Sequence, residues 1–404
     1  MKSVELFAGA GGLAMGAGLA GFEPLAVVEW DKWACDTLRE NGNRDYPLVS
    51  GWPVHEGDVR AFDWSGLPEG IDLVAGGPPC QPFSMGGKHK AFDDSRDMFP
   101  ATVNIVRQLR PRAFIVENVK GLTRSAFANY YQYILLQLEF PEVARKKKED
   151  WFDHLLRLQK ERSSGRLHGN GLTYNVVPTL VNAADYGVPQ KRERVFIVGM
   201  RADLGIEWSF PQKTHGYDAL LASQWIGRDY WERHEIAVKK RPTMPQKLAA
   251  RIQRLKERAP ILLPWRTTRD ALIGLPDPQS RAAKNFSDHR YQAGARVYPG
   301  HTGSVLDLPA KTLKAGDHGV PGGENMMVKD NGDVRYFTVR EAARLQTFPD
   351  GFRMHGSWTE TMRQLGNAVP VMLARIVAAS VAEKLLIHDL RAIARIHDRA
   401  RNVA

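Results

Sequence analysis

The chain has 404 residues, of which 43% are hydrophobic and 25% are charged, so it is long enough and apolar enough to bury a sizeable core. Its two cysteines exclude a disulfide framework and a four-cysteine zinc site, which indicates a reducing, cytoplasmic setting. Its net charge of +11 alone fits a solvated surface, but the clustering of the basic residues favours a polyanionic partner, and the lack of an apolar face beside them favours nucleic acid over a membrane surface.

The first half of the chain alternates short apolar runs with helix-like stretches. No run reaches the length of a membrane-spanning helix, and the first residues enter a strand pattern at once, which leaves no room for a signal peptide. The runs predict strands at residues 4–7, 24–28, 71–75, 113–116, 174–177 and 195–199. This alternation predicts an α/β fold of the Rossmann-like type, a mostly parallel sheet with helices on both faces. Ligands of such sheets bind at the carboxyl ends of the strands, where we look for a site.

The remainder of the chain divides into regions of different composition. We predict a catalytic domain over residues 1–202, with a basic, helical surface insertion at 141–170. Residues 203–334 predict a second, less regular domain with an amphipathic helix at 246–258. Residues 335–404 return to the first domain and end in a long helix that starts near residue 371. The excess positive charge concentrates in the second domain, at Lys239, Lys240, Arg241, Lys247, Arg251, Arg254, Lys256 and Arg258.

A glycine loop follows the first predicted strand. Gly9, Gly11 and Ala14 fit the pattern G-x-G-x-x-A, and Glu29 ends the second strand, where an acid can bind ribose hydroxyls. The loop has no lysine, which argues against an ATP phosphate site. This pattern alone fits an NAD site or only a tight turn.

The third predicted strand leads into the stretch GGPPCQPFS, which contains Cys80. A free cysteine is most often a small buried residue. However, two prolines before Cys80 and one soon after it predict a rigidly presented thiol. Cys35 lies in a predicted helix, where we expect it to serve packing.

Charged residues mark two further strands. Glu117 follows an apolar run, where a buried acid needs a partner, and taken alone it is better explained as a helix cap or a structural ion pair. Arg192 and Arg194 are two positions apart on an extended segment and predict a cationic pair for phosphate or carbonyl oxygens. A charged start of a strand, common in basic proteins, is the alternative.

Together these segments resemble the DNA cytosine-5 methyltransferases of bacterial restriction–modification systems. The matching stretches, in the family's order, are ELFAGAGGLAMG, VVEWD, GDV, GGPPCQPFS, FIVENVKGL, NAADYGVPQKRERVFIVG, TVREAARLQTFPDGF and QLGNAVP. They cover almost all of the chain outside the insertion and the middle domain. The insertion is longer than compact relatives carry. The resemblance implies transfer of a methyl group from S-adenosylmethionine, without a metal, to carbon 5 of a cytosine flipped out of duplex DNA.

The resemblance also implies the catalytic residues. Cys80 would add to carbon 6 of the cytosine, and Glu117, protonated or sharing a proton, would hydrogen-bond N3 and the exocyclic amine. Arg192 and Arg194 would bind the O2 carbonyl and the flanking phosphate, orient Glu117 and stabilise the added anion.

Two sets of binding residues follow from the same resemblance. The expected donor-binding residues are Phe7, Gly9, Gly11, Glu29, Trp30, Asp58, Val59, Pro79, Asn367, Ala368 and Val369. Among them, Glu29 would bind the ribose hydroxyls, Trp30 would stack on adenine, and Asp58 would bind its amino group. The donor carries no phosphate, so the lysine-free glycine loop suits it. The expected DNA-binding residues are Gln81, Ser84, Lys88, Thr312 and Leu313, the last two as a pair facing DNA in a target-recognition domain at 203–334.

The expected partner is double-stranded DNA in the bacterial cytoplasm, bound by a monomer, with a separately acting restriction endonuclease and no membrane. A tRNA cytosine-5 methyltransferase of the same family is the alternative. The large basic middle region favours duplex DNA, where a separate domain must read a groove. An NAD-dependent oxidoreductase would leave PPCQ, ENV and QKRER unexplained, and a non-catalytic DNA-binding module would need neither Cys80 nor Glu117.

Overall fold

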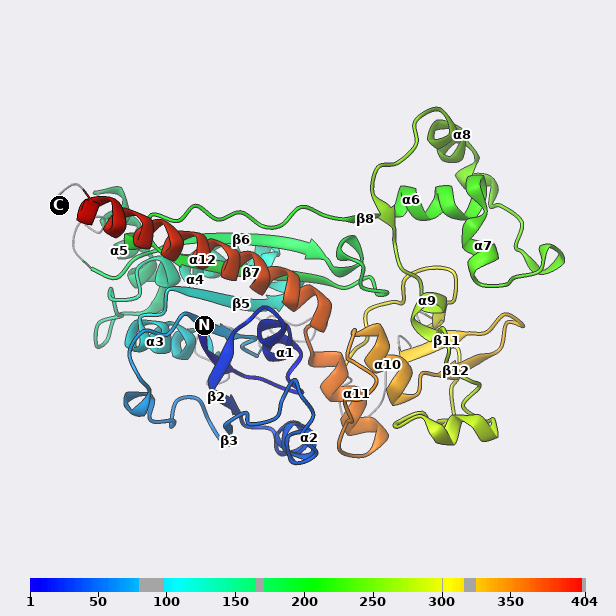
Figure 1. Ribbon diagram of the computed structural model, residues 1–404, viewed down its shortest axis with the longest axis horizontal. Coiled ribbons are helices and arrows are strands. Elements are labelled where there is room, and N and C mark those ends of the chain that lie inside the picture. The colour runs from blue at the N-terminus through cyan, green and yellow to red at the C-terminus, as the bar shows by residue number, and fades with distance from the viewer. Residues whose placement is uncertain (80–96, 165–170, 300, 316–324, 402–404) are drawn as a thin grey trace. The chain divides into compact units, whose positions relative to one another are not determined.

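The computed structural model describes residues 1–79, 97–164, 171–299, 301–315 and 325–401 (Figure 1). The chain divides into two compact units. The first unit comprises Met1–Val181, Glu193–Pro211 and Ala374–Ala404, and the second comprises Asn182–Arg192 and Gln212–Leu373. The second unit therefore includes more of the chain than the 203–334 region assigned to target recognition. The boundaries of a target-recognition domain within it stay a prediction.

The first unit is built on one sheet, which has seven strands in the described part of the chain. Their order across the sheet is β3-β2-β1-β4-β5-β7-β6. The strands are β1 (Lys2–Leu6), β2 (Glu23–Glu29), β3 (Val54–Glu56), β4 (Leu73–Gly76), β5 (Ala113–Val119), β6 (Tyr174–Asn182) and β7 (Glu193–Arg201). The pairs β1–β2, β1–β4, β2–β3 and β4–β5 are parallel, whereas β5 and β7 are antiparallel. The predicted mostly parallel sheet and its six predicted strands are confirmed.

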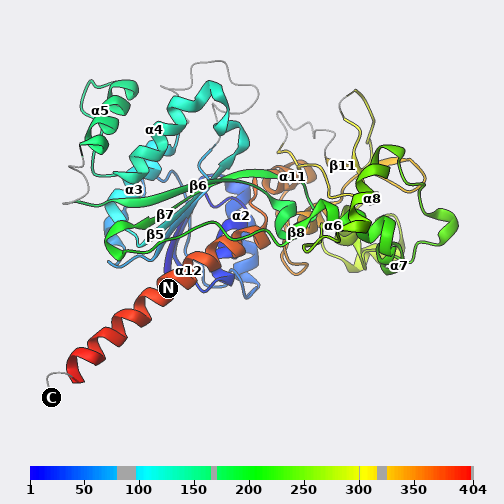
Figure 2. The same cartoon turned by 90° about the horizontal axis from the view of Figure 1, so that it is seen from above.

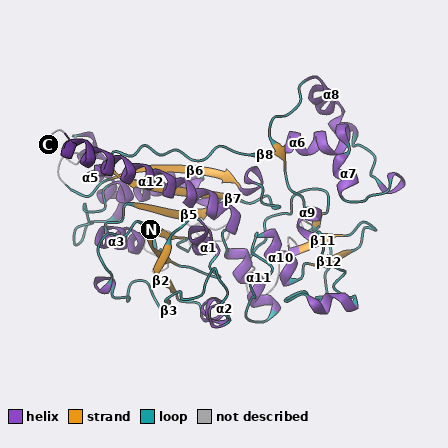
Figure 3. Cartoon of the chain, viewed as in Figure 1, coloured by secondary structure: helices purple, strands orange, loops and turns teal. Residues whose placement is uncertain are grey.

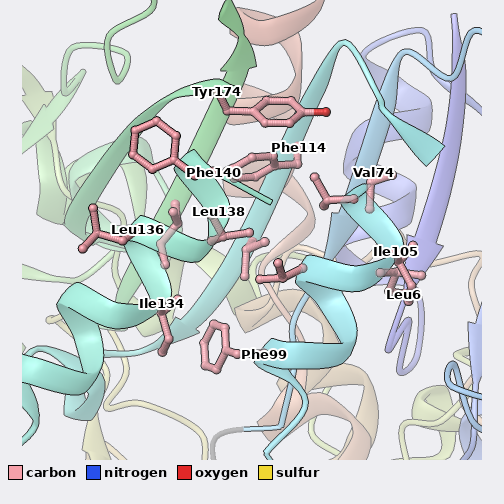
Figure 4. Close-up of a cluster of buried hydrophobic side chains, with 14 of the residues drawn as sticks. Leu6, Val74, Phe99, Ile105, Phe114, Ile134, Leu136, Leu138, Phe140 and Tyr174 are labelled. Atoms are coloured by element: carbon pink, nitrogen blue, oxygen red, sulfur yellow. The ribbon is translucent and has the colours of Figure 1, made fainter. Parts of the chain in front are cut away.

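Helices cover both faces of this sheet. They are α1 (Gly12–Leu19), α2 (Lys32–Asn43), α3 (Phe99–Leu109), α4 (Ala128–Glu139), α5 (Trp151–Ser163) and α12 (Val371–Arg401). Figure 2 shows α4 and α5 on one side of the sheet and α12 on the other. The α3–α4 side holds the main core, in which Phe114 of β5 packs against Tyr174 of β6 with ring centroids 5.0 Å apart (Figure 4). Alternation along β1 turns Val4 and Leu6 into this core.

The predicted insertion forms a helix, α5, which packs on α4 through buried Leu155 and Leu158. His154 is also buried, hydrogen-bonded to the Tyr133 hydroxyl at 2.9 Å and to the Val143 carbonyl at 2.8 Å. Residues 151–163 of the insertion therefore extend the core, on the α4 side of the sheet.

The long C-terminal helix predicted from residue 371 is confirmed as α12. By length and composition, the helical stretch Trp358–Asp398 could cross a membrane, which corrects the expectation that no such run exists. However, 67% of its apolar window is buried inside the structure, as in the core helix of a soluble protein.

The second unit has short helices and strands joined by longer loops (Figure 3). Its helices are α6 (Tyr217–Ala222), α7 (Asp229–Arg233), α8 (Ala249–Glu257), α9 (Thr268–Leu272), α10 (Val339–Leu345) and α11 (Trp358–Asn367). Its strands are β8 (His215–Gly216), β9 (Leu263–Pro264), β10 (Ser304–Val305), β11 (Met326–Val328) and β12 (Val334–Tyr336). A core of Leu220, Tyr230 and Trp231 holds α6 and α7 together. The helix predicted at 246–258 is confirmed, as α8 with a preceding 3₁₀ turn, and it buries Ile252.

Candidate active site

The carboxyl ends of four parallel strands meet at one edge of the first unit's sheet. The segments that follow β1, β2, β4 and β5 there begin at Phe7, Trp30, Gly77 and Lys120. This edge is the place where open α/β sheets bind ligands. It gathers the predicted donor loop, the acid that follows it in sequence and the stretch that leads to Cys80.

The loop after β1 is held in an unusual backbone conformation. Phe7, Gly9 and Gly11 have positive φ angles of 51°, 53° and 85°. For Phe7 this is a strained conformation that the surrounding structure must enforce. The positive φ of Gly11 favours glycine there, because a side chain would strain that backbone conformation.

Glu29 fixes this loop from the end of β2. Its Oε2 accepts a hydrogen bond from the Gly9 amide at 2.7 Å, and its Oε1 accepts from the Trp30 amide at 2.9 Å and from the Asp31 amide at 2.8 Å. Burial raises the pKa of Glu29, and the bonds from these amides oppose the shift. A carboxylate can accept about four hydrogen bonds. The Glu29 carboxyl therefore keeps acceptor capacity for a ligand hydroxyl.

The residues expected to surround adenine also lie in the first unit. The Trp30 side chain is 73% exposed, as a stacking platform requires, whereas Val59 is buried. The Asp58 carboxylate is engaged by Arg60, whose Nε lies 3.0 Å from both of its oxygens. That ion pair lowers the pKa of Asp58. Arg60 was not among the residues expected here. An arginine two residues after an acid could have predicted this ion pair from the sequence.

Asn118 anchors the stretch that leads to the predicted nucleophile. Cys80, Gln81, Ser84 and Lys88 lie outside the described residues; the exposed Pro79 is the last residue before them. The Asn118 side chain is buried, and its Nδ2 donates to the Pro78 carbonyl at 3.0 Å. Strand β5 therefore fixes the backbone two residues before Cys80. This role was not predicted, although a polar residue within a buried strand is a signal that the sequence carries.

Glu117 and Arg194 form a buried ion pair in the first unit. Arg194 Nε lies 2.8 Å from Glu117 Oε1, and the two side chains are 11% and 8% exposed. Antiparallel pairing of β5 with β7 sets Glu117 opposite Phe196 and Val119 opposite Arg194, so the two charged residues are diagonal neighbours. The guanidinium both compensates and orients the carboxylate.

Arg192 has different partners, among them three backbone carbonyls of the second unit. It is fully buried, and its Nη1 donates to the Leu313 carbonyl at 3.0 Å. Its Nη2 donates to the carbonyls of Gly366 at 2.6 Å and Ala368 at 2.9 Å. Although their spacing predicted one substrate-binding pair, the structure gives the two arginines separate sets of partners.

The late elements of the predicted site also belong to the second unit. Asn367 is exposed, whereas Ala368 and Val369 are 8% and 5% exposed. Thr312 donates from Oγ1 to the Lys191 carbonyl at 2.6 Å. Leu313 differs from the expectation of a DNA-facing side chain, because it is only 1% exposed and packs inside the unit.

Cys35 is a packing residue, as its helical position predicted. It is buried, its Sγ donates to the Glu29 carbonyl at 3.3 Å, and burial raises the pKa of its thiol to about 12. Such a thiol is not a nucleophile at neutral pH. Within the described ranges, no cluster of three or more His, Cys, Asp or Glu side chains is placed to hold a metal ion.

Comparison with known proteins identifies the family. A family model described as C-5 cytosine-specific DNA methylase matches residues 1–141 and 165–383. The chain belongs to this family of DNA methylases. The unmatched residues between the two ranges fall within the predicted insertion. Because the matching family acts on DNA, this result favours the DNA methyltransferase over the tRNA alternative, and it overturns the oxidoreductase and non-catalytic hypotheses.

Individual relatives agree with this assignment. The type II methyltransferase M.PspPI of Psychrobacter sp. (strain TA137) is 30% identical over 388 residues, covering 95% of this chain and 79% of its own. The type II methyltransferase M.NgoMIV of Neisseria gonorrhoeae is 30% identical over 392 residues, covering 95% and 97%.

Solved structures support the fold. A putative DNA modification methyltransferase encoded within an E. coli prophage superimposes with a TM-score of 0.58 at 22% identity, over 95% of this chain and 99% of its own. The S. pombe Dnmt2 methyltransferase superimposes with a TM-score of 0.52 at 16% identity, over 95% and 98%. Both confirm the methyltransferase fold predicted from the alternation of strands and helices.

Proposed function

We propose that this DNA methylase transfers the methyl group of S-adenosylmethionine to carbon 5 of one flipped-out cytosine within a specific duplex sequence. The proposal rests chiefly on the contacts that two residues make at the carboxyl end of β5. There, two consecutive residues hold the two parts of a catalytic site: Glu117 pairs with Arg194, and Asn118 holds the chain that leads to Cys80.

The proposed chemistry begins with the Cys80 thiolate, which adds to carbon 6 of the cytosine and forms a sulfur–carbon bond. Glu117 hydrogen-bonds the N3 edge of the base, and Arg194 orients Glu117 and stabilises the charge that develops on the ring. The electron pair displaced to carbon 5 would form the new bond to the methyl group, while the bond between that methyl group and the sulfonium sulfur breaks and its electron pair stays on sulfur, which leaves S-adenosylhomocysteine. Loss of the carbon 5 proton to a base then expels the thiolate, which restores both the aromatic ring and the enzyme.

The donor site that we propose in the first unit fits S-adenosylmethionine, which supplies an electrophilic methyl group on a sulfonium sulfur. Gly9 and Gly11 bring backbone close to the ligand, Glu29 accepts from the ribose hydroxyls, and Trp30 offers an exposed ring to adenine. A lysine-free loop of this kind binds a donor that has no phosphate.

In the cell we propose a cytoplasmic enzyme that works as a monomer on nucleoid DNA. The type II methyltransferases among its relatives and the basic second unit support a role in protecting host DNA, with a cognate endonuclease acting separately on the same sequence.

Trapping on a mechanism-based substrate tests the chemistry. Fluorine at carbon 5 cannot leave as a proton does, so duplex DNA containing 5-fluorocytosine should hold the enzyme covalently after methyl transfer, in a complex that survives denaturant. Cys80→Ser should form no complex, because a hydroxyl is far less acidic and less nucleophilic than a thiol. Cys35→Ser is the matched control and should trap as well as the wild type. A crosslink that maps to any residue other than Cys80 would overturn the proposal.

A further inference from the structure

The fully buried Arg192 connects three separate backbone segments of the second unit. The first is its own segment, which lies beside residues 310–313. Gln190 and Ala310 form a parallel bridge, and the Lys191 amide donates to the Ala310 carbonyl at 2.8 Å. The Leu313 amide donates to Gln190 Oε1 at 3.0 Å, and Arg192 adds its own bond to the Leu313 carbonyl. Residues 310–313 are therefore attached along their length to residues 190–192.

Residues 310–313 are the second segment that Arg192 contacts, and the third is the end of α11. The last carbonyls of a helix lack partners inside the helix and carry partial negative charge, which a guanidinium satisfies. Arg192 binds two such carbonyls, those of Gly366 and Ala368. The neighbouring chain passes very close at this point, since a Cβ on Gly366 would lie 2.3 Å from the Ala315 amide nitrogen. The helix end and residues 313–315 therefore cannot shift independently.

We infer that Arg192 is a positioning residue that couples recognition of target DNA to binding of the methyl donor. This inference rests on the proposed function and on the roles that the family resemblance implies, in which Thr312 contacts DNA and Asn367 to Val369 contact the donor. One guanidinium, removed from water, holds the backbone of both elements. Displacing either element would leave a buried charged donor unsatisfied, so an arrangement favoured by one ligand is also favoured by the other. By linkage the coupling is reciprocal.

The test measures this coupling directly. The dissociation constant of S-adenosylhomocysteine is measured by calorimetry with and without a saturating duplex that contains the methylated sequence. In the wild type, DNA should tighten that binding by a factor within the usual range for coupled sites, about 5- to 150-fold. Arg192→Lys should bring the factor close to 1, because an ammonium group cannot hold both elements in the planar geometry of a guanidinium.

Arg340→Lys is the matched control. Arg340 is also buried in the second unit and donates to the carbonyls of Ser287, Pro349 and Phe352, at 3.1, 3.1 and 2.7 Å. Its variant should lower thermal stability as much as Arg192→Lys does, yet keep the wild-type coupling factor. A loss of coupling in both variants would reduce the role of Arg192 to general stability and overturn the inference.

A milder variant keeps the inference testable if Arg192→Lys does not fold. Gln190→Met removes the acceptor of the Leu313 amide and should lower the coupling factor part of the way. An unchanged factor in a folded Arg192→Lys, or in Gln190→Met if only that variant folds, overturns the inference. So does a wild-type factor of 1. A wild-type protein that transfers no methyl group to DNA would instead overturn the proposed function.

Discussion

Asn118 fixes the backbone next to the proposed nucleophile, Cys80. Its buried amide holds the Pro78 carbonyl, and Pro78 lies two residues before Cys80. Asn118→Asp keeps the shape of the side chain but removes the donor. We expect the turnover number to fall on the order of 10²-fold, as small misplacements of reacting groups do, with little change in donor affinity. Single-turnover methyl transfer and donor titration measure the two quantities separately.

A matched control for this variant is Asn41→Asp. Asn41 is also buried, and its Nδ2 donates to the Thr37 carbonyl at 2.7 Å within α2. This change should cost stability without lowering turnover. If both variants lose turnover equally, or if Asn118→Asp keeps it, the positioning role of Asn118 is wrong.

Glu5 is a buried acid for which the proposed mechanism has no use. It is 2% exposed on β1, and the Ser3 hydroxyl donates to its Oε1 at 2.9 Å. Burial raises the pKa of Glu5 to about 7, against 4.5 for an ordinary glutamate. A raised pKa means that the folded state binds the proton more tightly than the unfolded state does. The stabilisation is therefore complete below pH 4.5 and is lost as the pH rises through about 7.

Glu5→Gln should remove this pH dependence, because a glutamine oxygen can still accept from Ser3 and carries no charge to bury. The variant should gain stability relative to the wild type between pH 5 and pH 8, by on the order of 3 kcal/mol for a shift of this size. Urea unfolding at the two pH values measures the gain, with the exposed Glu23→Gln as control. Parallel pH dependence in the Glu5 variant and the wild type would refute the assignment.

Arg192, just before β7, and Arg194, within it, show which side-chain contacts could be predicted from the sequence and which could not. Their spacing predicted a pair, and the resemblance predicted an orienting partner for Glu117; the structure places Arg194 there. The contacts of Arg192 with Leu313, Gly366 and Ala368 could not be predicted from the sequence, because these backbone carbonyls are 121 to 176 positions away. Backbone carbonyls carry no residue-specific signal.

At the scale of elements, helix α8 carries three residues of the second unit's basic cluster, Arg251, Arg254 and Lys256. Its buried Ile252 fixes the inner face, and Arg254 and Lys256 are exposed. Replacing both with alanine preserves the helix, since alanine has the highest helix propensity. If both residues neutralise phosphates, the slope of log affinity for DNA against log salt should become shallower by about 1.8. Fluorescence anisotropy over a series of salt concentrations measures the slope.

The control removes the same charge elsewhere. Lys384 and Arg391 are exposed on α12, and their double alanine variant should leave the slope at its wild-type value. An unchanged slope in the α8 variant would mean that this helix does not contact the duplex.

Elements were predicted well where their apolar pattern was clear. Six strands of the large sheet, α8 and α12 all had such a pattern. Strand β3 was missed, because Val54, His55 and Glu56 form a three-residue edge strand with only one apolar side chain. The segment is recognisable as a strand only from its backbone pairing with β2, which its composition does not indicate.

For the whole molecule, the sequence identified the fold class and the family, but it could not assign the extent of the second unit. That unit also includes residues 182–192 and 335–373, which are held to it by contacts far apart in the sequence. Gln190, for example, donates to the Leu345 carbonyl across 155 positions. The composition of the chain suggested a region from 203 to 334, but composition does not indicate which distant segments contact each other.

The most direct test of the proposed function is bisulfite sequencing of DNA from cells that express the chain, beside cells that express Cys80→Ser. We predict that one cytosine in every copy of a single short duplex sequence resists conversion in the first cells and is converted in the second. Complete conversion of all cytosines, in cells shown to contain the folded wild-type protein, would contradict the proposal.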